Sequence, residues 1–188
     1  KRDVDRELIK GEVLRFKGKI EEITGQEITA GRLKEAIRLI NNRRRVLQRL
    51  NKLRAASPSP ISGRDALLIN QISFYDDPPR FTKNIEALCD ELEKRAAAGE
   101  GIVQNGVPRL MMSGCPMAVP NWKLPFVVES SGAVIVGEES CIGTRNTRDL
   151  VSESGQSVDE MIDAIVDRYM RIDCACFTPN LERLEHIV

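Results

Sequence analysis

Two short apolar runs, separated by a segment with helical spacing, constrain the fold of this 188-residue chain most strongly. Residues 109–113 follow a loop that contains Gly and Pro, and residues 133–136 follow Gly132. Such runs, bounded by turn residues, are typical of buried strands. Between them, Asn121 can cap a helix that ends at Gly132. Strand, helix and strand with short connections predict a parallel α/β sheet of Rossmann or flavodoxin type, with helices on both faces.

The first hundred residues predict helices that flank this sheet. Apolar residues recur at helical spacing in four stretches, which are residues 4–23, 29–50, 62–72 and 81–98. We therefore divide the chain into a helical segment, residues 1–98, and a parallel α/β unit, residues 99–188. The chain begins without Met and ends inside a predicted helix, so we expect the natural protein to be longer at both ends.

Local capping signals define several of these helices. Ser62 with Asp65, and Ser157 with Glu160, have the three-residue spacing of a capping box. Thr178, followed by Pro179, predicts the start of a last helix. These signals are short-range, so they locate helix starts without saying what the helices pack against.

Composition excludes several classes of function. Lys plus Arg and Asp plus Glu number 28 each, and this zero net charge argues against nucleic-acid binding through phosphates. No run of about 18 apolar residues occurs, so no membrane span is expected. The five cysteines are odd in number and no secretory feature accompanies them, which favours a reducing cytoplasm over a disulfide framework.

The cysteines are the residues with the clearest chemical potential. Cys115 and Cys141 each follow a predicted strand, and ligands gather at the carboxyl ends of parallel strands. We expect these two thiols to lie close together. Cys174 and Cys176 follow a helix that returns across the sheet, so their loop is expected at the opposite edge and their role stays open. Cys89 lies beside the apolar face of its helix and is interpreted as a packing cysteine.

Clustered thiolates suit soft metals and iron–sulfur centres, whereas buried structural thiols are the alternative. Zinc is disfavoured, because no C-x2-C pair occurs and the only histidine is His186. Cys174-x-Cys176 is one residue shorter than the usual redox dithiol motif. Glu138 and Glu139 are conceivable acid and base groups, but we expect both to face solvent.

Four motifs together resemble one known family. They are residues 113–117 (SGCPM), 120–125 (PNWKLP), 138–145 (EESCIGTR) and 173–180 (DCACFTPN). Their order and spacing resemble subunits of the 2-hydroxyacyl-CoA dehydratases and benzoyl-CoA reductases. Residues 28–44 and 60–63 also match, so the resemblance covers most of the chain. The thiols at both Cys115 and Cys141 resemble the double-cubane-cluster branch of that family.

The resemblance implies two Rossmann-like domains with an iron–sulfur cluster between them, either [4Fe–4S] or double-cubane. It implies Cys115 and Cys141 as metal ligands, with Cys174 and Cys176 as further candidates. The expected enzyme is a 2-hydroxyacyl-CoA dehydratase-like lyase or an ATP-dependent reductase of aromatic acyl-CoA, driven by low-potential electrons. The isolated chain is expected to lack the cluster and to be inactive. A non-catalytic electron-storage or interaction protein of the same fold is the alternative.

The resemblance also implies an ATP-dependent activator as electron donor, and a homologous subunit in a homo- or heterodimer. The polar segment at residues 143–156 follows Cys141 directly, and we expect it to be mobile because it buries little apolar area. Arg145 within it is expected to offset negative charge on a thiolate-ligated cluster or a phosphate-bearing substrate. A simple surface arginine is the alternative.

Overall fold

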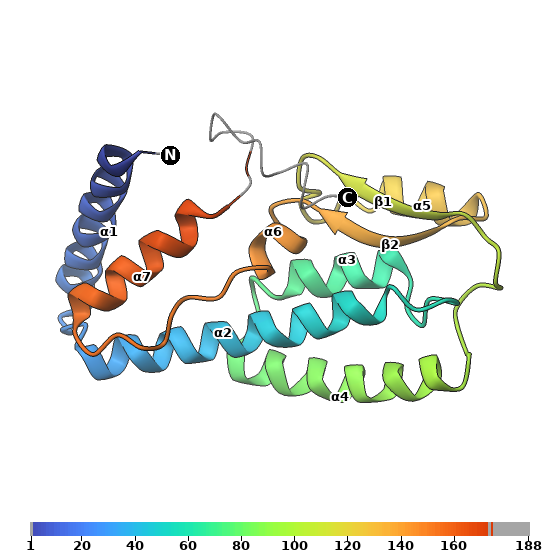
Figure 1. Ribbon diagram of the computed structural model, residues 1–188, viewed down its shortest axis with the longest axis horizontal. Coiled ribbons are helices and arrows are strands. Elements are labelled where there is room, and N and C mark those ends of the chain that lie inside the picture. Colours follow the sequence, from blue (N-terminus) through green and yellow to red (C-terminus); the bar gives the residue numbers. More distant parts are fainter. Residues whose placement is uncertain (1, 173, 175–188) are drawn as a thin grey trace. The chain divides into compact units, whose positions relative to one another are not determined.

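The computed structural model describes residues 2–172 and residue 174 (Figure 1). Within this part of the chain there are seven helices and two strands. In order they are α1 (Asp3–Thr24), α2 (Ala30–Leu53), α3 (Gly63–Ile72), α4 (Pro78–Ala97), β1 (Arg109–Ser113), α5 (Lys123–Ser130), β2 (Val134–Glu139), α6 (Thr144–Thr147) and α7 (Val158–Met170). The predicted helical first hundred residues and the strand–helix–strand order are confirmed. The helix predicted to start at Thr178 lies outside the described residues.

The chain forms two compact units. One contains residues up to Asn41 and those from Asp149 onward, and the other contains Asn42–Arg148. Helix α2 begins in the first unit and ends in the second. The division at residues 98 and 99 expected from the sequence stays a prediction.

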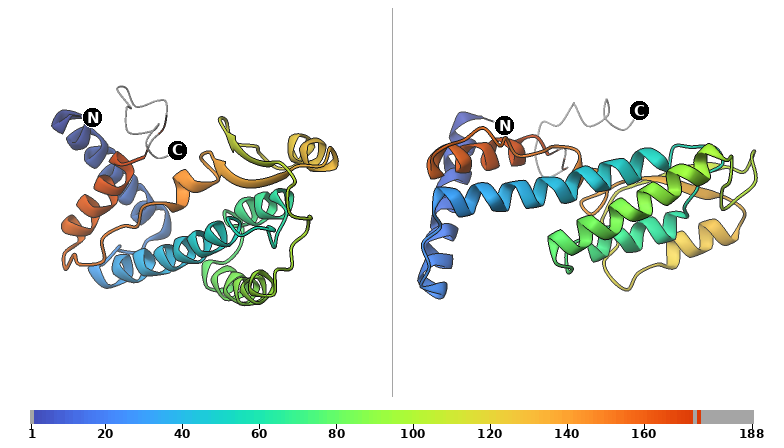
Figure 2. Two further views of the ribbon diagram at one scale, coloured as in Figure 1. Left: turned by 45° about the vertical axis from the view of Figure 1, so that its right-hand side comes forward. Right: turned by 90° about the horizontal axis from the view of Figure 1, so that it is seen from below.

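The sheet belongs to the second unit. Its two strands, β1 and β2, are parallel, and the pairing runs from Arg109 opposite Val134 to Ser113 opposite Glu139. The register shifts once, between Leu110 and Met111. The predicted parallel pairing of residues 109–113 with 133–136 is therefore confirmed (Figure 2). A helix-rich chain with a two-stranded parallel sheet is compatible with the α/β class, but it does not by itself establish a Rossmann or flavodoxin fold.

Helices cover the sheet unevenly. Helices α3 and α5 contact β2 and also contact each other. At Gly63, the first residue of α3, a Cβ would overlap the side chain of Ile135, so this glycine permits the close approach. Helices on both faces of the sheet are not confirmed within the described residues.

The prediction that β1 is a buried strand was wrong. Val134 and Ile135 of β2 are both 1% exposed, whereas Leu110 and Met111 of β1 are 42% and 48% exposed. β1 is an edge strand in the described sheet. An apolar run predicts a strand, but what covers that strand is decided by elements distant in the sequence.

The core of the second unit lies between α2 and α4. Phe81, Ile85 and Leu92 of α4 recur at helical spacing and pack with Leu47 and Leu50 of α2. Asp77 caps α4 by accepting a hydrogen bond from the backbone N–H of Arg80 at 3.0 Å, and Pro78 and Pro79 occupy its first positions.

Cys89 belongs to this same core. It is fully buried, and its thiol donates a weak hydrogen bond to the carbonyl oxygen of Val46 at 3.9 Å. Burial raises the pKa of the Cys89 thiol to about 11, so the group stays neutral at physiological pH. The interpretation of Cys89 as a packing cysteine is confirmed.

Most of the predicted caps are present. Ser157 accepts from the backbone N–H of Glu160 at 3.2 Å, and the Glu160 carboxylate returns to the Ser157 N–H, which completes the capping box. Ser62 accepts from the Asp65 N–H at 2.9 Å. The cap predicted at Asn121 was wrong, because α5 starts one residue later, with Trp122 as N-cap. The backbone N–H of Asn121 instead closes a turn onto the carbonyl oxygen of Ala118 at 2.7 Å.

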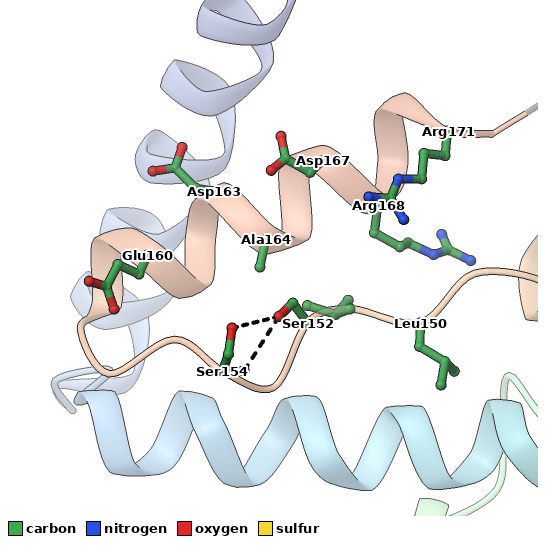
Figure 3. A pocket seen from close by; sticks show the side chains of 10 residues that line it. Leu150, Ser152, Ser154, Glu160, Asp163, Ala164, Asp167, Arg168 and Arg171 are labelled. Carbon is green, nitrogen blue, oxygen red and sulfur yellow. Dashed lines mark hydrogen bonds between the residues drawn. The ribbon is translucent and has the colours of Figure 1, made fainter.

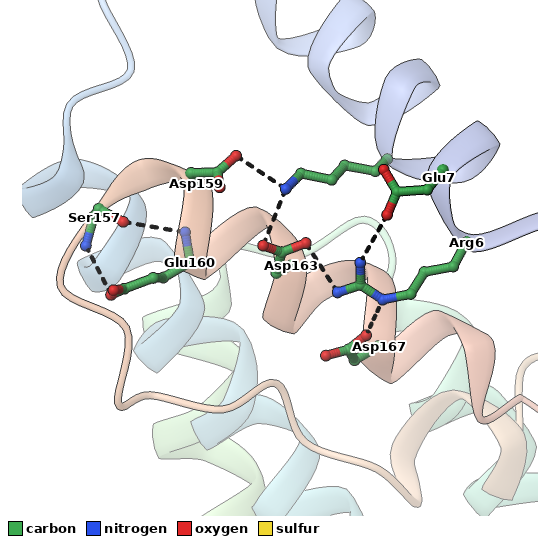
Figure 4. A network of polar contacts seen from close by, with 8 residues as sticks. Arg6, Glu7, Ser157, Asp159, Glu160, Asp163 and Asp167 are labelled. Atoms are coloured by element: carbon green, nitrogen blue, oxygen red, sulfur yellow. Dashed lines mark hydrogen bonds and ion pairs between the residues drawn. The ribbon is translucent and has the colours of Figure 1, made fainter. Parts of the chain in front are cut away.

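In the first unit, α1 and α7 lie side by side and are joined by an ionic network (Figure 4). Arg6 of α1 pairs with Asp163 at 2.9 Å and Asp167 at 2.7 Å, and Lys10 pairs with Asp159 at 3.1 Å and Asp163 at 3.0 Å. The Lys10 ammonium, with help from Arg6, lowers the pKa of the Asp163 carboxyl. Four ion pairs therefore connect these two helices, and no residue of α1 is fully buried.

None of the helices in the described part of the chain combines the length and the apolar character that a bilayer crossing requires.

Candidate functional site

Two cysteine-bearing turns leave the sheet at its carboxyl edge. Cys115 lies two residues beyond the end of β1, and Cys141 lies two residues beyond the end of β2. Because the strands are parallel and pair up to Ser113 and Glu139, both turns start from the same edge. Both thiols are free and exposed. The expectation that topology brings these turns to one edge is confirmed, and metal binding by the thiols stays a prediction.

A buried ion pair supports the Cys141 turn. Glu139 and Arg145 are 6% and 7% exposed, and their side chains meet in a bidentate pair. The second contact of that pair, from Arg145 Nη2 to Glu139 Oε2, is 2.6 Å long. Arg145 Nη1 also donates to Cys141 Sγ at 3.7 Å. Arg145 is therefore not a simple surface arginine, and it places a positive charge beside the thiol.

The Glu139 carboxylate also links the ends of the two strands. Ser113 Oγ, at the end of β1, donates to Glu139 Oε2 at 2.8 Å. The pair with Glu139 raises the pKa of the Arg145 guanidinium, so the arginine stays charged. The expectation that Glu139 faces solvent was wrong, since the residue is an internal part of the site.

The turn that follows Cys141 is tightly packed. The backbone N–H of Gly143 bonds the carbonyl oxygen of Ser140 at 3.1 Å, and Thr144 Oγ1 donates to the carbonyl oxygen of Glu138 at 3.1 Å. A Cβ at Gly143 would overlap that same carbonyl oxygen of Glu138. The turn therefore needs glycine here for space.

The segment at residues 143–156 differs from the mobile loop expected from its polar sequence. It begins with the short helix α6, and Arg145, Thr147 and Val151 within it are buried. The premise that it buries little was wrong. Its polar side chains are used internally, a feature that composition alone does not reveal.

The Cys115 turn is held by a different set of contacts. Gly114 has φ of 139°, a backbone conformation that glycine adopts far more readily than other residues. Gln71 of α3 donates from Nε2 to the carbonyl oxygen of Met117 at 2.8 Å and accepts from the Trp122 ring N–H at 2.8 Å. One buried amide therefore holds the middle and the last residue of the loop that carries Cys115.

A pocket of about 420 Å³ opens at this edge of the sheet. Its lining combines four apolar side chains with Cys115 and three polar residues, and consists of Met111, Met112, Ser113, Gly114, Cys115, Met117, Leu124, Glu138 and Ser140. Pockets that bind small molecules have this character, mostly apolar with a few polar groups that converge.

Glu138 is a buried carboxyl group among the residues that line this pocket. It is 2% exposed, and neither carboxylate oxygen has a hydrogen-bond partner. Burial raises the pKa of the Glu138 carboxyl, while the charge of Arg54 and the nearby Asn70 amide oppose that rise to a smaller extent. The expectation that Glu138 faces solvent was wrong. A signal was present in the sequence, because Arg54, one residue beyond the end of α2, continues the helical spacing of Leu47 and Leu50, and a buried arginine favours a buried acid nearby.

A second pocket, of about 490 Å³, belongs to the other unit and is drawn in Figure 3. Its charged residues are already engaged. Asp163 and Asp167 pair with Arg6, Glu160 caps α7, and Arg168 Nε donates to the carbonyl oxygen of Asp149 at 3.2 Å. We therefore assign these groups to the packing of the first unit.

The remaining predicted ligands, Cys174 and Cys176, follow α7 in the sequence. Cys174 is partly buried, and Cys176 lies outside the described residues. Within the part of the chain that the structure describes, no group of three or more His, Cys, Asp or Glu residues is arranged to hold a metal ion. Cys115, Cys141 and Arg145 thus form the core of the candidate site.

Comparison with known proteins identifies the family of this chain. The family model for the D-component of 2-hydroxyglutaryl-CoA dehydratase matches residues 1–188. The chain belongs to this family. The resemblance found in the cysteine motifs is thereby confirmed.

Two relatives extend along the whole chain. YjiM of Escherichia coli (strain K12), which bears the name of a putative dehydratase subunit, is 35% identical over 98% of this chain and 47% of its own length. The (R)-phenyllactyl-CoA dehydratase beta subunit of Clostridium sporogenes is 21% identical over 100% of this chain and 48% of its own length. The chain therefore spans about half the length of these relatives.

Proposed function

We propose that the intact protein is an iron–sulfur subunit of a dehydratase that acts on a 2-hydroxyacyl-CoA thioester with low-potential electrons. The family model and the (R)-phenyllactyl-CoA dehydratase relative support the reaction class. The observation that carries the proposal is the pair of exposed thiols, Cys115 and Cys141, at the ends of two paired parallel strands.

The exposed thiols are the type of ligand that holds an iron–sulfur cluster. Such clusters are held by cysteine thiolates, and both cysteines are exposed at one edge, with a cationic Arg145 beside Cys141. Cys115 and Cys141 would supply two of the ligands. Cys174 and Cys176 are further candidates, and other ligands would come from elsewhere in the intact protein. When bound, the cluster, either [4Fe–4S] or double-cubane, supplies one-electron chemistry.

The chain's own residues hold this arrangement. Glu139 fixes the guanidinium of Arg145, and Ser113 fixes Glu139 from the neighbouring strand. A thiolate-ligated cluster carries negative charge, so Arg145 would stabilise its more reduced state. The proposed chemistry requires two partners. An ATP-driven activator donates the electron, and a homologous subunit completes the enzyme.

Cysteine variants of the intact protein test the metal assignment. After anaerobic reconstitution, Cys115→Ser and Cys141→Ser should each lose iron and change the EPR spectrum of the reduced protein. Cys89→Ser is the matched control, because Cys89 is buried in the apolar core and should leave both readouts unchanged. Wild-type iron content in both exposed-cysteine variants would refute the assignment.

Turnover separates the dehydratase from its alternatives. The cluster-loaded protein with its activator should release water from a 2-hydroxyacyl-CoA and form the 2,3-unsaturated thioester. Reduction of an aromatic acyl-CoA instead would identify a reductase. A protein that holds the cluster and accepts electrons but transforms neither thioester would be an electron-storage or interaction protein of the same fold.

A further inference from the structure

Helix α1 carries a row of large apolar side chains on one side. Leu8 and Phe16 are each 67% exposed, and Ile23 is 82% exposed. They follow one another at intervals of eight and seven residues, so with about 3.6 residues per turn they lie along one side of the helix. Single exposed apolar residues are ordinary on a protein surface, whereas a row aligned along one helix indicates a contact with another element.

This row lies away from the side of α1 that packs within its own unit. Arg6 and Lys10 face α7, where both pair with Asp163 (Figure 4). At about 100° per residue, they lie roughly 80° and roughly 120° around the helix from Phe16. A second helix can therefore pack along the row while the ionic network with α7 stays intact.

The row is self-complementary about Phe16. In an antiparallel copy centred on this residue, Leu8 would lie against Ile23 of the other copy, because the two are eight and seven residues from the centre. Glu12 and Lys19 are four and three residues from the centre, so the same alignment sets opposite charges against each other twice. A parallel alignment would instead set each charge against its own kind, which is unfavourable. The apolar row and its charges therefore fit a second copy of α1.

The two charged residues are accessible for such a contact. The side chains of Glu12 and Lys19 are 55% and 64% exposed. Within one copy, Glu12 pairs with Arg15 at 2.8 Å and Lys19 pairs with Glu22 at 2.7 Å. Exposed ion pairs between residues three apart on a helix contribute little stability, so Glu12 and Lys19 can exchange these partners for each other across an interface.

We propose that α1 docks in antiparallel orientation on α1 of a second copy of this chain, with Phe16 at the twofold axis. The inference goes beyond the proposed function, because it concerns assembly and applies with or without a cluster. Two facing helices bury less area than the standard interface of about 1,600 Å², so we expect a dissociation constant of about 1–10 µM. The opposite charges on either side of Phe16 select a copy of the same helix as the partner.

Sedimentation velocity on the intact protein measures the association. Wild type should form dimers as its concentration rises from about 0.1 µM to about 100 µM. Phe16→Ala should raise the dissociation constant at least about 100-fold, because both copies lose a ring at the axis. Leu14→Ala is the matched control, since Leu14 is also exposed on α1 but lies roughly 160° around the helix from Phe16. Wild type that stays monomeric, or equal effects of the two variants, would overturn the proposal.

A charge exchange tests the antiparallel alignment. Glu12→Lys and Lys19→Glu should each raise the dissociation constant about tenfold, because each sets like charges against each other twice. The double variant restores opposite charges and should return to within about threefold of wild type. Glu22→Lys is the control for charge reversal, since Glu22 is exposed roughly 120° around the helix from Phe16 and should have little effect. A double variant as weak as the single variants would refute the alignment.

Cross-linking locates the axis. In Phe16→Cys, a short bismaleimide should join the two introduced thiols, and mass spectrometry identifies the joined peptides, whereas Leu14→Cys should give no such product. A dimer that persists in Phe16→Ala and lacks this cross-link would show that the copies meet elsewhere. A monomer in which the introduced thiol of Phe16→Cys resists maleimide would show that another part of the intact protein covers the row. Both results would overturn the proposal.

Fold and iron content keep this test separate from the proposed function. The variants change exposed residues of α1 and replace no proposed ligand, so circular dichroism and iron content should stay at wild-type levels. If Phe16→Ala lost its fold, the charge exchange would decide alone. Wild type that binds iron but stays monomeric would refute this inference and leave the proposed function standing. Wild type that dimerises through α1 but binds no iron would refute the proposed function alone.

Discussion

The two cysteine turns leave the same edge of one sheet, yet they are held in different ways. The Cys141 turn rests on charge, through the buried pair of Glu139 and Arg145. The Cys115 turn rests on neutral hydrogen bonds from Gln71. A buried, bidentate ion pair fixes geometry firmly, and removal of one partner costs much stability. Removal of a neutral hydrogen bond costs less. We therefore expect Cys141 to be the rigid ligand and Cys115 the adaptable one.

The largest expected effect comes from breaking the ion pair. Glu139→Ala leaves the Arg145 guanidinium buried without its partner, which costs about 3–5 kcal/mol of stability for a buried pair. Urea unfolding followed by circular dichroism measures this loss. Glu93→Ala is the matched control, since Glu93 pairs with Arg49 at the surface and should have little effect. Equal losses of unfolding free energy in the two variants would show that the buried pair contributes no more to stability than the surface pair.

The next effect tests space at the Cys141 turn. Gly143→Ala drives a Cβ into the carbonyl oxygen of Glu138, and such overpacking costs about 1–3 kcal/mol. Gly31→Ala, where a Cβ meets no atom within 4 Å and the residue is helical, should be neutral or slightly stabilising. Thermal unfolding of both variants gives the comparison. A neutral Gly143→Ala would mean that the turn is looser than its contacts indicate.

A smaller effect is expected on the other turn. Gln71→Leu removes the hydrogen bonds to Met117 and Trp122, and each net bond of this kind contributes about 1 kcal/mol. Amide hydrogen exchange should become faster at residues 114–122. Residues 140–147 serve as the internal control and should keep their protection. Uniform acceleration of exchange in both stretches would indicate that the two turns share one support and would contradict their separate anchoring.

The smallest effect is a trend with pH at Glu138. Burial raises its pKa, so the folded state holds this proton more tightly than the unfolded state does. That contribution is fully present below the unfolded pKa of about 4.3 and is lost as pH rises through the folded pKa. Arg54 and Asn70, which face Glu138, reduce the trend without reversing it.

Urea unfolding between pH 4 and pH 8 measures this trend. Wild type should lose stability relative to Glu138→Gln as pH rises, because glutamine has no proton to lose. A difference between the two proteins that stays constant across this range would contradict the raised pKa.

The sequence by itself determined mainly features that depend on neighbours within about four residues, together with the pairing of two strands joined by one helix. The cap at Ser62 and the full capping box at Ser157 formed with the expected partners, because those partners lie three residues away. Both strands and their parallel pairing followed from short apolar runs around one helix. The packing role of Cys89 followed from its place beside an apolar helical face.

Only the tertiary structure decided burial and charge at the candidate site. β1 was predicted to be a buried strand but is exposed, while Glu138 and Glu139 were predicted to face solvent but are buried. The reason is physical: a side chain's surroundings are set by whatever packs against it, and here these are Ser113, Arg54 and Asn70 from distant parts of the chain. Local pattern places a residue on an element, and the fold alone decides whether that position faces water, a pocket or an opposite charge.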